Sequence, residues 1–222
     1  MAKRIGFLGT KGGVGTTTVA VHFAEAWASR GAPVVLVTDD ARGHGLRLLV
    51  EARDTPLATE YVIHPAEGLS AAVEAAGHEQ VVVDLGTSPA TFDLDLVVLV
   101  SNGLPESLAH AHGLAKSLPE GILVALLINA PVAGCDATAV LRRLVGTCAA
   151  FGSHRVVPLG VVPHSRAVSK WATRSKTAQE LGAWLPAAKV IAKLTDELIA
   201  LSCEAVEAPT VDLHGLVADR AA

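Results

Sequence analysis

The feature that most constrains this chain is a short apolar segment that leads into a glycine-rich turn and then into a helical pattern. Ile5–Leu8 is apolar, Gly9–Thr18 contains four glycines, and apolar residues then recur at helical spacing. Those later residues are Val19, Phe23 and Trp27. Glycines let successive backbone N–H groups point inward, and the start of a helix adds further unpaired N–H groups. The order of strand, turn and helix therefore predicts a phosphate-binding loop.

A plain connecting turn is the alternative for this segment. The turn has a lysine near its start, Lys11, and a run of threonines at its end. The hydroxyl of Thr17 sits where it can bind a Mg²⁺ ion that bridges the β- and γ-phosphates of a nucleotide. These flanking residues favour the phosphate loop over the plain turn.

Apolar runs alternate with alanine-rich helical stretches along the rest of the chain. The expected strands are Ile5–Leu8, Val34–Val37, Val81–Val83, Leu96–Val100, Ile122–Ile128 and Val156–Val161. The expected helices are Thr17–Ser29, Leu69–Ala76, Ser107–Leu118, Ala137–Ala149 and Ala187–Leu201. Most strand runs are continuous, as in a parallel sheet covered on both faces. The pattern predicts an α/β fold with a doubly wound, mostly parallel sheet flanked by helices, Rossmann-like. Together with the expected phosphate loop after the first strand, it indicates a fold of the P-loop NTPase type.

Composition narrows the class of protein. With 222 residues, the chain is expected to form one domain over residues 1–202, followed by a tail at 203–222. Half of the residues are hydrophobic and 18% are charged, which excludes global disorder. Cys135, Cys148 and Cys203 lack metal-ligand spacing and are expected to be reduced, buried thiols. No secretion signal or membrane span is recognisable, so we expect a cytoplasmic protein.

Carboxylates follow two of the expected strands. Val81–Val83 ends in Asp84, where a carboxylate can hold Mg²⁺ beside the phosphate loop. Asp39 and Asp40 follow the strand Val34–Val37. Solvation at a strand end is the competing interpretation for these two residues, and it is the stronger for Asp39.

The segment Lys11-Gly12-Gly13-Val14-Gly15-Thr16-Thr17 resembles the deviant Walker A box of the ParA/MinD superfamily of P-loop ATPases. The resemblance implies that ATP and Mg²⁺ are the cofactors and that Lys11 is catalytic, reaching the phosphates across an ATP-bound homodimer. The implied nucleotide-binding residues of the loop are Lys11, Gly12, Gly13, Val14, Gly15, Thr16, Thr17 and Thr18. Thr17, Asp84 and Asp40 are the implied metal-site residues.

This box departs from the family at Thr16, where relatives have a second lysine. Losing a charge-assisted contact costs roughly 1.5–3 kcal/mol, so fast hydrolysis is expected to suffer more than nucleotide binding. Similar lysine-less boxes occur in the CpaE/TadZ proteins of pilus assembly and the BcsQ proteins of cellulose secretion. A second departure is Thr38, where the family has the first aspartate of its switch segment. Asp40 matches the second, catalytic aspartate, which helps to position the attacking water.

Two later segments also resemble family landmarks. Asn129 ends the strand Ile122–Ile128, where relatives place an asparagine that contacts the base. Pro163 lies in a segment that resembles the one beside the adenine in the family. The resemblance thus implies that both residues bind the nucleotide.

A basic stretch follows in the last third of the chain. Its positive residues are Arg166, Lys170, Arg174, Lys176, Lys189 and Lys193, and its only acid is Glu180. In ParA proteins, basic residues of the C-terminal part bind DNA without sequence preference. An ordinary solvated helix face explains the same pattern equally well. Because the tail is acidic, with Arg220 as its single basic residue, we expect no direct membrane anchor.

Three functional hypotheses follow. The first is a ParA/MinD-like ATPase that forms a nucleotide-dependent homodimer, hydrolyses ATP slowly under the control of a regulatory partner protein, and positions a cargo. The second is an ATP-bound scaffold with poor hydrolysis that serves pilus or polysaccharide secretion machinery. The third, a metabolic or metal-transfer enzyme, would need metal-binding cysteines or a substrate domain, and neither is recognisable in the sequence.

Overall fold

A seven-stranded sheet forms the centre of the structure, a computed structural model that describes residues 3–38, 59–63, 68–76, 80–89, 93–151, 154–164 and 186–207. The strands are β1 (Arg4–Gly9), β2 (Val34–Thr38), β3 (Thr59–Ile63), β4 (Gln80–Asp84), β5 (Leu96–Ser101), β6 (Leu123–Asn129) and β7 (Arg155–Val162). Their order across the sheet is β3-β2-β4-β1-β5-β6-β7, and each of these neighbouring pairs is parallel. The predicted parallel sheet is therefore confirmed.

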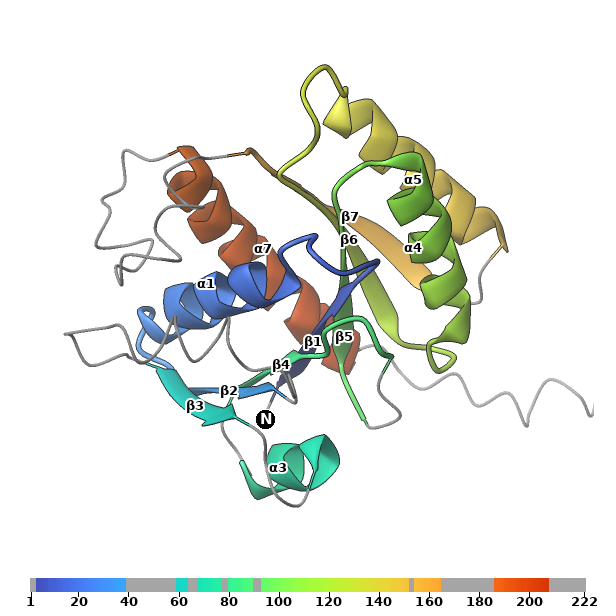
Figure 1. The fold of residues 1–222 in the computed structure, drawn as a ribbon. Coiled ribbons are helices and arrows are strands. Elements are labelled where there is room, and N and C mark those ends of the chain that lie inside the picture. Colours follow the sequence, from blue (N-terminus) through green and yellow to red (C-terminus); the bar gives the residue numbers. More distant parts are fainter. Residues whose placement is uncertain are drawn as a thin grey trace, which may run out of the picture.

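Helices cover both faces of this sheet (Figure 1). They are α1 (Thr16–Ala28), α3 (Leu69–Ala75), α4 (Pro105–Ser117), α5 (Ala137–Phe151) and α7 (Pro186–Glu207). α1 and α7 pack on one face, whereas α3, α4 and α5 pack on the other. This three-layer arrangement confirms the doubly wound α/β fold.

The strand order places the glycine-rich loop at a special position. From β1 the chain moves to one side of the sheet through β2, β3 and β4, and β5 then starts on the other side of β1. In open parallel sheets, ligands bind outside the carboxyl ends of the strands where the order reverses in this way. The loop that follows β1 lies at that point.

The predicted elements are all present, and the structure adds one strand. β3 lies at the edge of the sheet and pairs with β2, from Val34 opposite Thr59 to Thr38 opposite Ile63. An edge strand needs few apolar residues, and this one begins with a threonine and a glutamate, so its sequence carries a weak strand signal. α4 begins earlier than expected because Pro105 occupies its first turn, where a missing N–H group costs nothing.

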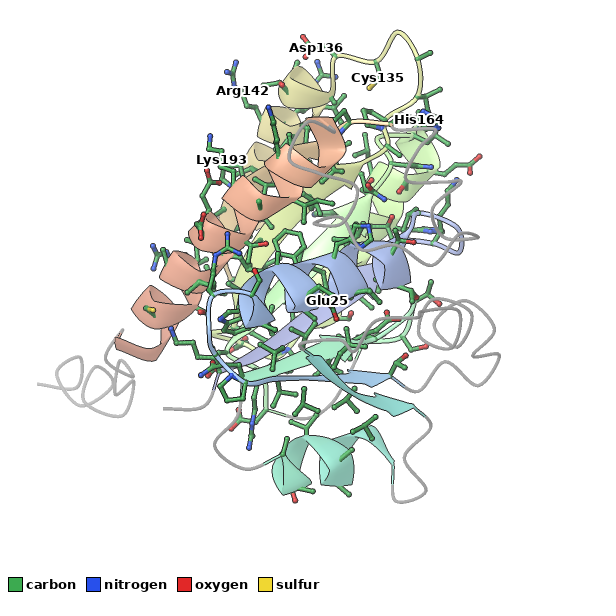
Figure 2. The ribbon with its side chains drawn as sticks, turned by 90° about the vertical axis from the view of Figure 1, so that its left-hand side faces the viewer. Glu25, Cys135, Asp136, Arg142, His164 and Lys193 are labelled. Atoms are coloured by element: carbon green, nitrogen blue, oxygen red, sulfur yellow. The ribbon has the colours of Figure 1, made fainter. Side chains whose placement is uncertain are left out.

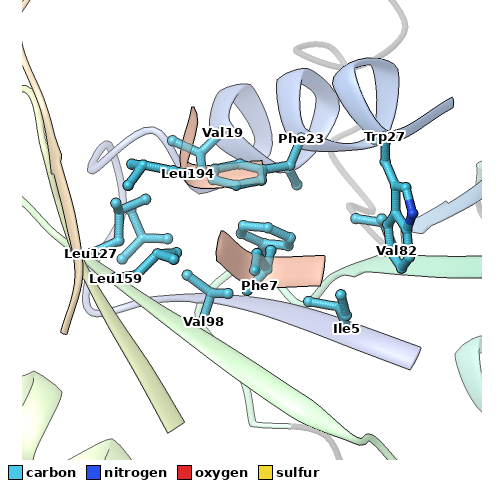
Figure 3. Packing of buried hydrophobic residues seen from close by; sticks show 14 of the residues in the cluster. Ile5, Phe7, Val19, Phe23, Trp27, Val82, Val98, Leu127, Leu159 and Leu194 are labelled. Carbon is cyan, nitrogen blue, oxygen red and sulfur yellow. The ribbon is translucent and has the colours of Figure 1, made fainter. Parts of the chain in front are cut away.

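The core under α1 is built around two aromatic rings (Figure 3). The ring centroids of Phe7 on β1 and Phe23 on α1 lie 5.3 Å apart, and the planes are tilted by 42°. Val19 and Trp27 flank Phe23 on the same helix face and are buried, as is Leu194 of α7. Aromatic pairs of this geometry contribute beyond their buried area. The helical spacing seen in the sequence thus identifies the side of α1 that packs on this core, although most other residues of the helix are buried as well.

The cysteines differ in exposure, contrary to the expectation that all three are buried. Cys148 is buried, Cys135 is half-buried, and Cys203 is exposed on α7, where its Sγ accepts a hydrogen bond from Lys3 Nζ. α7 continues past Leu201, so Cys203 lies on a helix rather than in an irregular segment. Among the helices that the structure describes, none is long and apolar enough to cross a membrane.

Arg30 joins α1 to α7 on the surface. Its guanidinium donates from Nε to Asp196 Oδ1 at 2.6 Å, from Nη2 to the carbonyl of Ala192 at 2.8 Å, and from Nη1 to the carbonyl of Ala26. The hydrogen bond from Arg30 lowers the pKa of Asp196, with a smaller contribution from the positive charge itself. The pair therefore stabilises the packing of α7 only while Asp196 is ionised.

The variant Asp196→Asn tests this contact. A carboxyl whose pKa is lowered on folding stabilises the protein above its unfolded pKa, and this effect is lost as the pH falls through the folded pKa. Because the pair is largely exposed, we expect the variant to lose less than about 1 kcal/mol of unfolding free energy at pH 7. Urea unfolding of both proteins measures the difference, which should begin to fall near the ordinary pKa of aspartate, about 4, and should vanish as the pH falls through the lower folded pKa. A difference that stays constant down to pH 2 would contradict the assignment.

Candidate phosphate-binding site

The loop between β1 and α1 presents backbone N–H groups that have no partner among the residues that the structure describes. Among the hydrogen bonds of the described residues, none uses the N–H groups of residues 12–15. Gly13 and Gly15 have φ angles of 79° and 84°, in the left-handed region that favours glycine. Alternating backbone conformations of this kind turn successive N–H groups toward one concave side, which binds anions.

The start of α1 lacks a cap as well. Gly15 is the N-cap residue, and no side chain caps the helix, although three threonines follow. Unpaired N–H groups at a helix N-terminus carry a partial positive charge and stabilise a bound anion. The loop and the start of α1 lie together where the sequence predicts a phosphate site.

Thr16 does not replace the family lysine in this site. Its side chain is buried and turned back against Gly9, so that a Cβ atom on Gly9 would overlap Thr16 Oγ1. The same Cβ would lie 3.0 Å from the carbonyl of Gly86, to which the Gly9 N–H group donates at 2.7 Å. The space under the loop is filled by a short hydroxyl side chain and carries no positive charge.

Three side chains, from α1, β2 and β4, meet at one side of the loop. Thr17 Oγ1 donates to Asp84 Oδ2 at 2.6 Å, and Thr38 Oγ1 lies 3.5 Å from the same oxygen. The other oxygen, Oδ1, accepts the N–H group of Gly86 at 3.2 Å. Asp84 is 2% exposed, so this carboxylate is buried among hydrogen-bond donors. The structure thus brings together Thr17 and Asp84, which the sequence singled out separately.

Residues at the start of the loop are attached to the first turn of α4. Thr10 Oγ1 lies 2.5 Å from Ser107 Oγ and donates to the carbonyl of Val100 at 3.1 Å. Ser107 Oγ also lies 2.8 Å from Ser101 Oγ. Lys11 Nζ lies 3.5 Å from Glu106 Oε2, with the two side chains 28% and 80% exposed. Sequence reasoning missed these serines, since a serine at a strand end or in a first helical turn carries no distinctive signal.

A cavity of about 480 Å³ opens between the start of the loop and α4. It is lined by Thr10, Lys11, Gly12, Thr87, Ala109, His110, Gly113 and Leu114. His110 Nδ1 lies 3.0 Å from the carbonyl oxygen of Thr10. Because a carbonyl only accepts, Nδ1 carries the proton of this hydrogen bond. His110 therefore belongs to the surroundings of the loop, which its position in the sequence did not indicate.

Asn129 and Pro163 lie at the same edge of the sheet as the loop. Asn129 is paired in register with Val162, the residue before Pro163. The side chain of Asn129 donates from Nδ2 to the carbonyl oxygen of Val14 at 2.8 Å. Asn129 thus contacts the loop itself, and a contact of either residue with a base stays a prediction.

Several predicted site residues fall outside the described part of the chain. These are Asp40, Arg166, Lys170, Arg174 and Lys176. Of the basic stretch, Lys189 and Lys193 are described, and both are exposed on α7. Figure 2 shows Lys193 on this helix. Lys193 Nζ lies 3.5 Å from Glu197 Oε1, so its charge is partly compensated. The described residues alone do not form the predicted basic patch.

Comparisons with known proteins give matches in structure. No family model and no curated protein matches the sequence. The cell division protein MinD of Aquifex aeolicus is similar in fold, with a TM-score of 0.69 and 18% identity over 90% of this chain and 97% of that protein. The septum site-determining protein MinD of Pyrococcus horikoshii, complexed with Mg-ADP, has a TM-score of 0.68 and 16% identity over 92% and 99% of the two chains.

A third match is pNOB8 ParA bound to nonspecific DNA. It has a TM-score of 0.61 and 12% identity over 92% of this chain and 99% of that one. The parallel sheet, its helices and the loop after β1 define a P-loop NTPase fold. Within that class, the chain has the fold of the ParA/MinD ATPases.

The variant Thr38→Asp tests the environment of Asp84. Thr38 is fully buried, so an aspartate there would put a second carboxylate beside the first. Without divalent ions we expect the free energy of unfolding to fall by about 3 kcal/mol. Mg²⁺ should restore part of this stability, because a cation between two carboxylates offsets their repulsion.

The variant Thr38→Asn is the matched control, since it has the same shape as the aspartate and no charge. Thermal unfolding with and without Mg²⁺ measures both proteins. Equal stability of the two variants in the absence of Mg²⁺ would show that position 38 does not face Asp84.

Proposed function

We propose that this protein is a member of the ParA/MinD superfamily that binds ATP with Mg²⁺ at the loop between Gly9 and Thr18. The observation that supports this most is the uncapped start of α1 beside the Thr17–Asp84 pair. The loop N–H groups that precede this helix have no partner among the described residues. A phosphate chain can accept hydrogen bonds from several N–H groups of the loop and of the helix start at once. The MinD of similar fold is complexed with Mg-ADP.

The residues present suit these cofactors. Hydroxyl and carboxylate oxygens are ligands that Mg²⁺ prefers, and Thr17 and Asp84 supply one of each at the foot of the loop. The bound ion neutralises charge on the β- and γ-phosphates. The loop amides from Gly12 to Thr18 would hold the phosphates, and Pro163 would lie near the base. Asp40 is proposed as the residue that orients the attacking water.

A homodimer formed around the nucleotide is the second part of the proposal. Lys11 is the proposed residue that reaches the partner's phosphates. Its present contact with the highly exposed Glu106 is a surface ion pair, which is worth little and easily exchanged. The side chain can thus leave Glu106 for a phosphate without a large loss of stability.

Hydrolysis is proposed to be slow and stimulated by a regulatory partner protein, so that the dimer acts as a switch that positions a cargo. Thr16 is turned under the loop and brings no charge to the phosphates. Transition-state charge thus lacks one fixed cation, which slows the chemical step. We propose DNA as one surface that the dimer binds, with Lys189, Lys193 and the basic residues that precede them in sequence contacting its phosphates. A ParA of similar fold is bound to nonspecific DNA.

An ATP-bound scaffold of pilus or polysaccharide secretion machinery, in the cytoplasm, is the alternative. The same burial of Thr16 favours it, together with Thr38 in place of the first switch aspartate. In this alternative the dimer binds ATP without significant turnover, and the partner recognises the ATP-bound shape.

The variant Lys11→Ala tests ATP binding and dimer formation together. We expect the wild type to bind ATP in the presence of Mg²⁺ by calorimetry and to form a dimer in ATP by light scattering. Lys11→Ala should bind ATP with an affinity within about tenfold of wild type, since backbone amides remain, but should stay monomeric. Lys116→Ala, which removes an exposed lysine of α4, is the control and should dimerise normally. No ATP binding by the wild type would refute the proposed function, and a dimer in Lys11→Ala would refute the role of Lys11.

Phosphate release separates the switch from the scaffold. For the switch we expect slow turnover that rises with nonspecific DNA or the partner and disappears in Asp40→Ala. Thr16→Lys should raise turnover by roughly ten- to a hundredfold, because a charge-assisted contact is worth about 1.5–3 kcal/mol. Thr16→Met has similar length without charge and should not raise it. ATP binding without release under all of these conditions would favour the scaffold.

A further inference from the structure

The side chain of Asn129 contacts the backbone at the middle of the phosphate loop. β6, which ends at Asn129, is separated from β1 by β5, so the contact crosses the full width of a strand. Asn129 Nδ2 lies 2.8 Å from the carbonyl oxygen of Val14. A carbonyl accepts hydrogen bonds and cannot donate them, so this contact fixes which end of the amide faces the loop.

This hydrogen bond sets the orientation of one peptide group. The described residues contain no cis peptide bond, so the carbonyl of Val14 and the N–H group of Gly15 point in opposite directions. With the carbonyl held on Asn129, the Gly15 N–H group faces away from β6. The carbonyl of Gly15 accepts the N–H group of Val19, which starts α1. Both carbonyl groups that flank the Gly15 N–H group are thus occupied, while this donor has no partner among the described residues.

Asn129 and Gly15 are sterically matched. A Cβ atom on Gly15 would lie 2.5 Å from Asn129 Nδ2, so the asparagine approaches this closely because the position is glycine. Val14 is anchored on its other side, since its side chain is 3% exposed and belongs to the core. The backbone of Asn129 is fixed in turn by its pairing with Val162 and by the N–H group of Ala130, which donates to the carbonyl of Val162 at 2.8 Å.

We infer that Asn129 is a positioning residue of the phosphate loop, which holds the Val14–Gly15 peptide so that the Gly15 N–H group faces the phosphate chain. The inference rests on the proposed function, because it concerns the same loop. It assigns to Asn129 an action on the phosphates, through the loop backbone, that does not depend on the base of the nucleotide. An amide is required because a carboxylate of the same shape has no N–H group to donate.

Tripolyphosphate is the probe that isolates this action, since it has phosphates and no base. We expect Asn129→Asp to weaken the binding of tripolyphosphate with Mg²⁺ by roughly tenfold or more, and that of ATP by a similar factor. Asn102→Asp is the matched control. It adds the same charge just after β5, at the same edge of the sheet. Asn102 Oδ1 accepts a hydrogen bond from the N–H group of Leu104, and an aspartate can still accept it. This control should bind tripolyphosphate nearly as well as wild type.

A spectroscopic readout separates positioning from general loss of structure. In protein labelled with ¹⁵N at glycine, tripolyphosphate should shift the amide signal of Gly15 in wild type and in Asn102→Asp. The shift should be lost in Asn129→Asp while the unliganded protein melts within a few degrees of wild type. If Asn129→Asp melts much lower, the variant Asn129→Ala, which adds no charge, is measured in its place.

The outcomes distinguish the two proposals. Wild type that binds neither ATP nor tripolyphosphate would overturn the proposed function and this inference with it. Wild type that binds both, with Asn129→Asp and Asn129→Ala unchanged toward tripolyphosphate, would overturn the inference alone. Weakened binding of ATP without weakened binding of tripolyphosphate would show that Asn129 acts on the base and would likewise overturn it.

Discussion

The rest of the site depends on the peptide N–H groups from Gly12 to Gly15, which have no partner within the described part of the chain. Successive N–H groups that point to one concave side, next to the start of a helix, favour the binding of an anion. The surrounding structure keeps this run of N–H groups open. Thr16 fills the space beneath the turn, and Val14 is anchored in the core. The left-handed conformations of Gly13 and Gly15 keep α1 from starting earlier in the loop.

The fold could be predicted from the sequence almost completely, because each buried parallel strand is an uninterrupted apolar run. β3 was the exception, since an edge strand with one neighbour is not required to be apolar on both faces. The loop and Asp84 were also predictable, because each follows directly from a strand that ends at the same edge of the sheet. Asp40 lies outside the described residues, so its role stays a prediction.

Other parts of the site required the three-dimensional structure. Ser107 and His110 approach Thr10 from α4, 97 and 100 residues away along the chain, and no local pattern identifies such partners. Asn129 was singled out from the sequence for a contact with a base, whereas the structure shows its hydrogen bond to the loop backbone. A family resemblance assigns roles by position in the sequence, but the direction of a side chain depends on what packs beside it.

The attachment of Thr10 and Lys11 to the first turn of α4 has a mechanical consequence. Three residues of α4 contact the start of the loop. Glu106 forms an ion pair with Lys11, and Ser107 and His110 contact the hydroxyl and the carbonyl of Thr10. A helix is stiff along its axis, so tilting α4 by a few degrees displaces all three anchors together. A molecule that binds the outer surface of α4 and shifts this helix would therefore also shift Thr10 and Lys11 at the start of the loop.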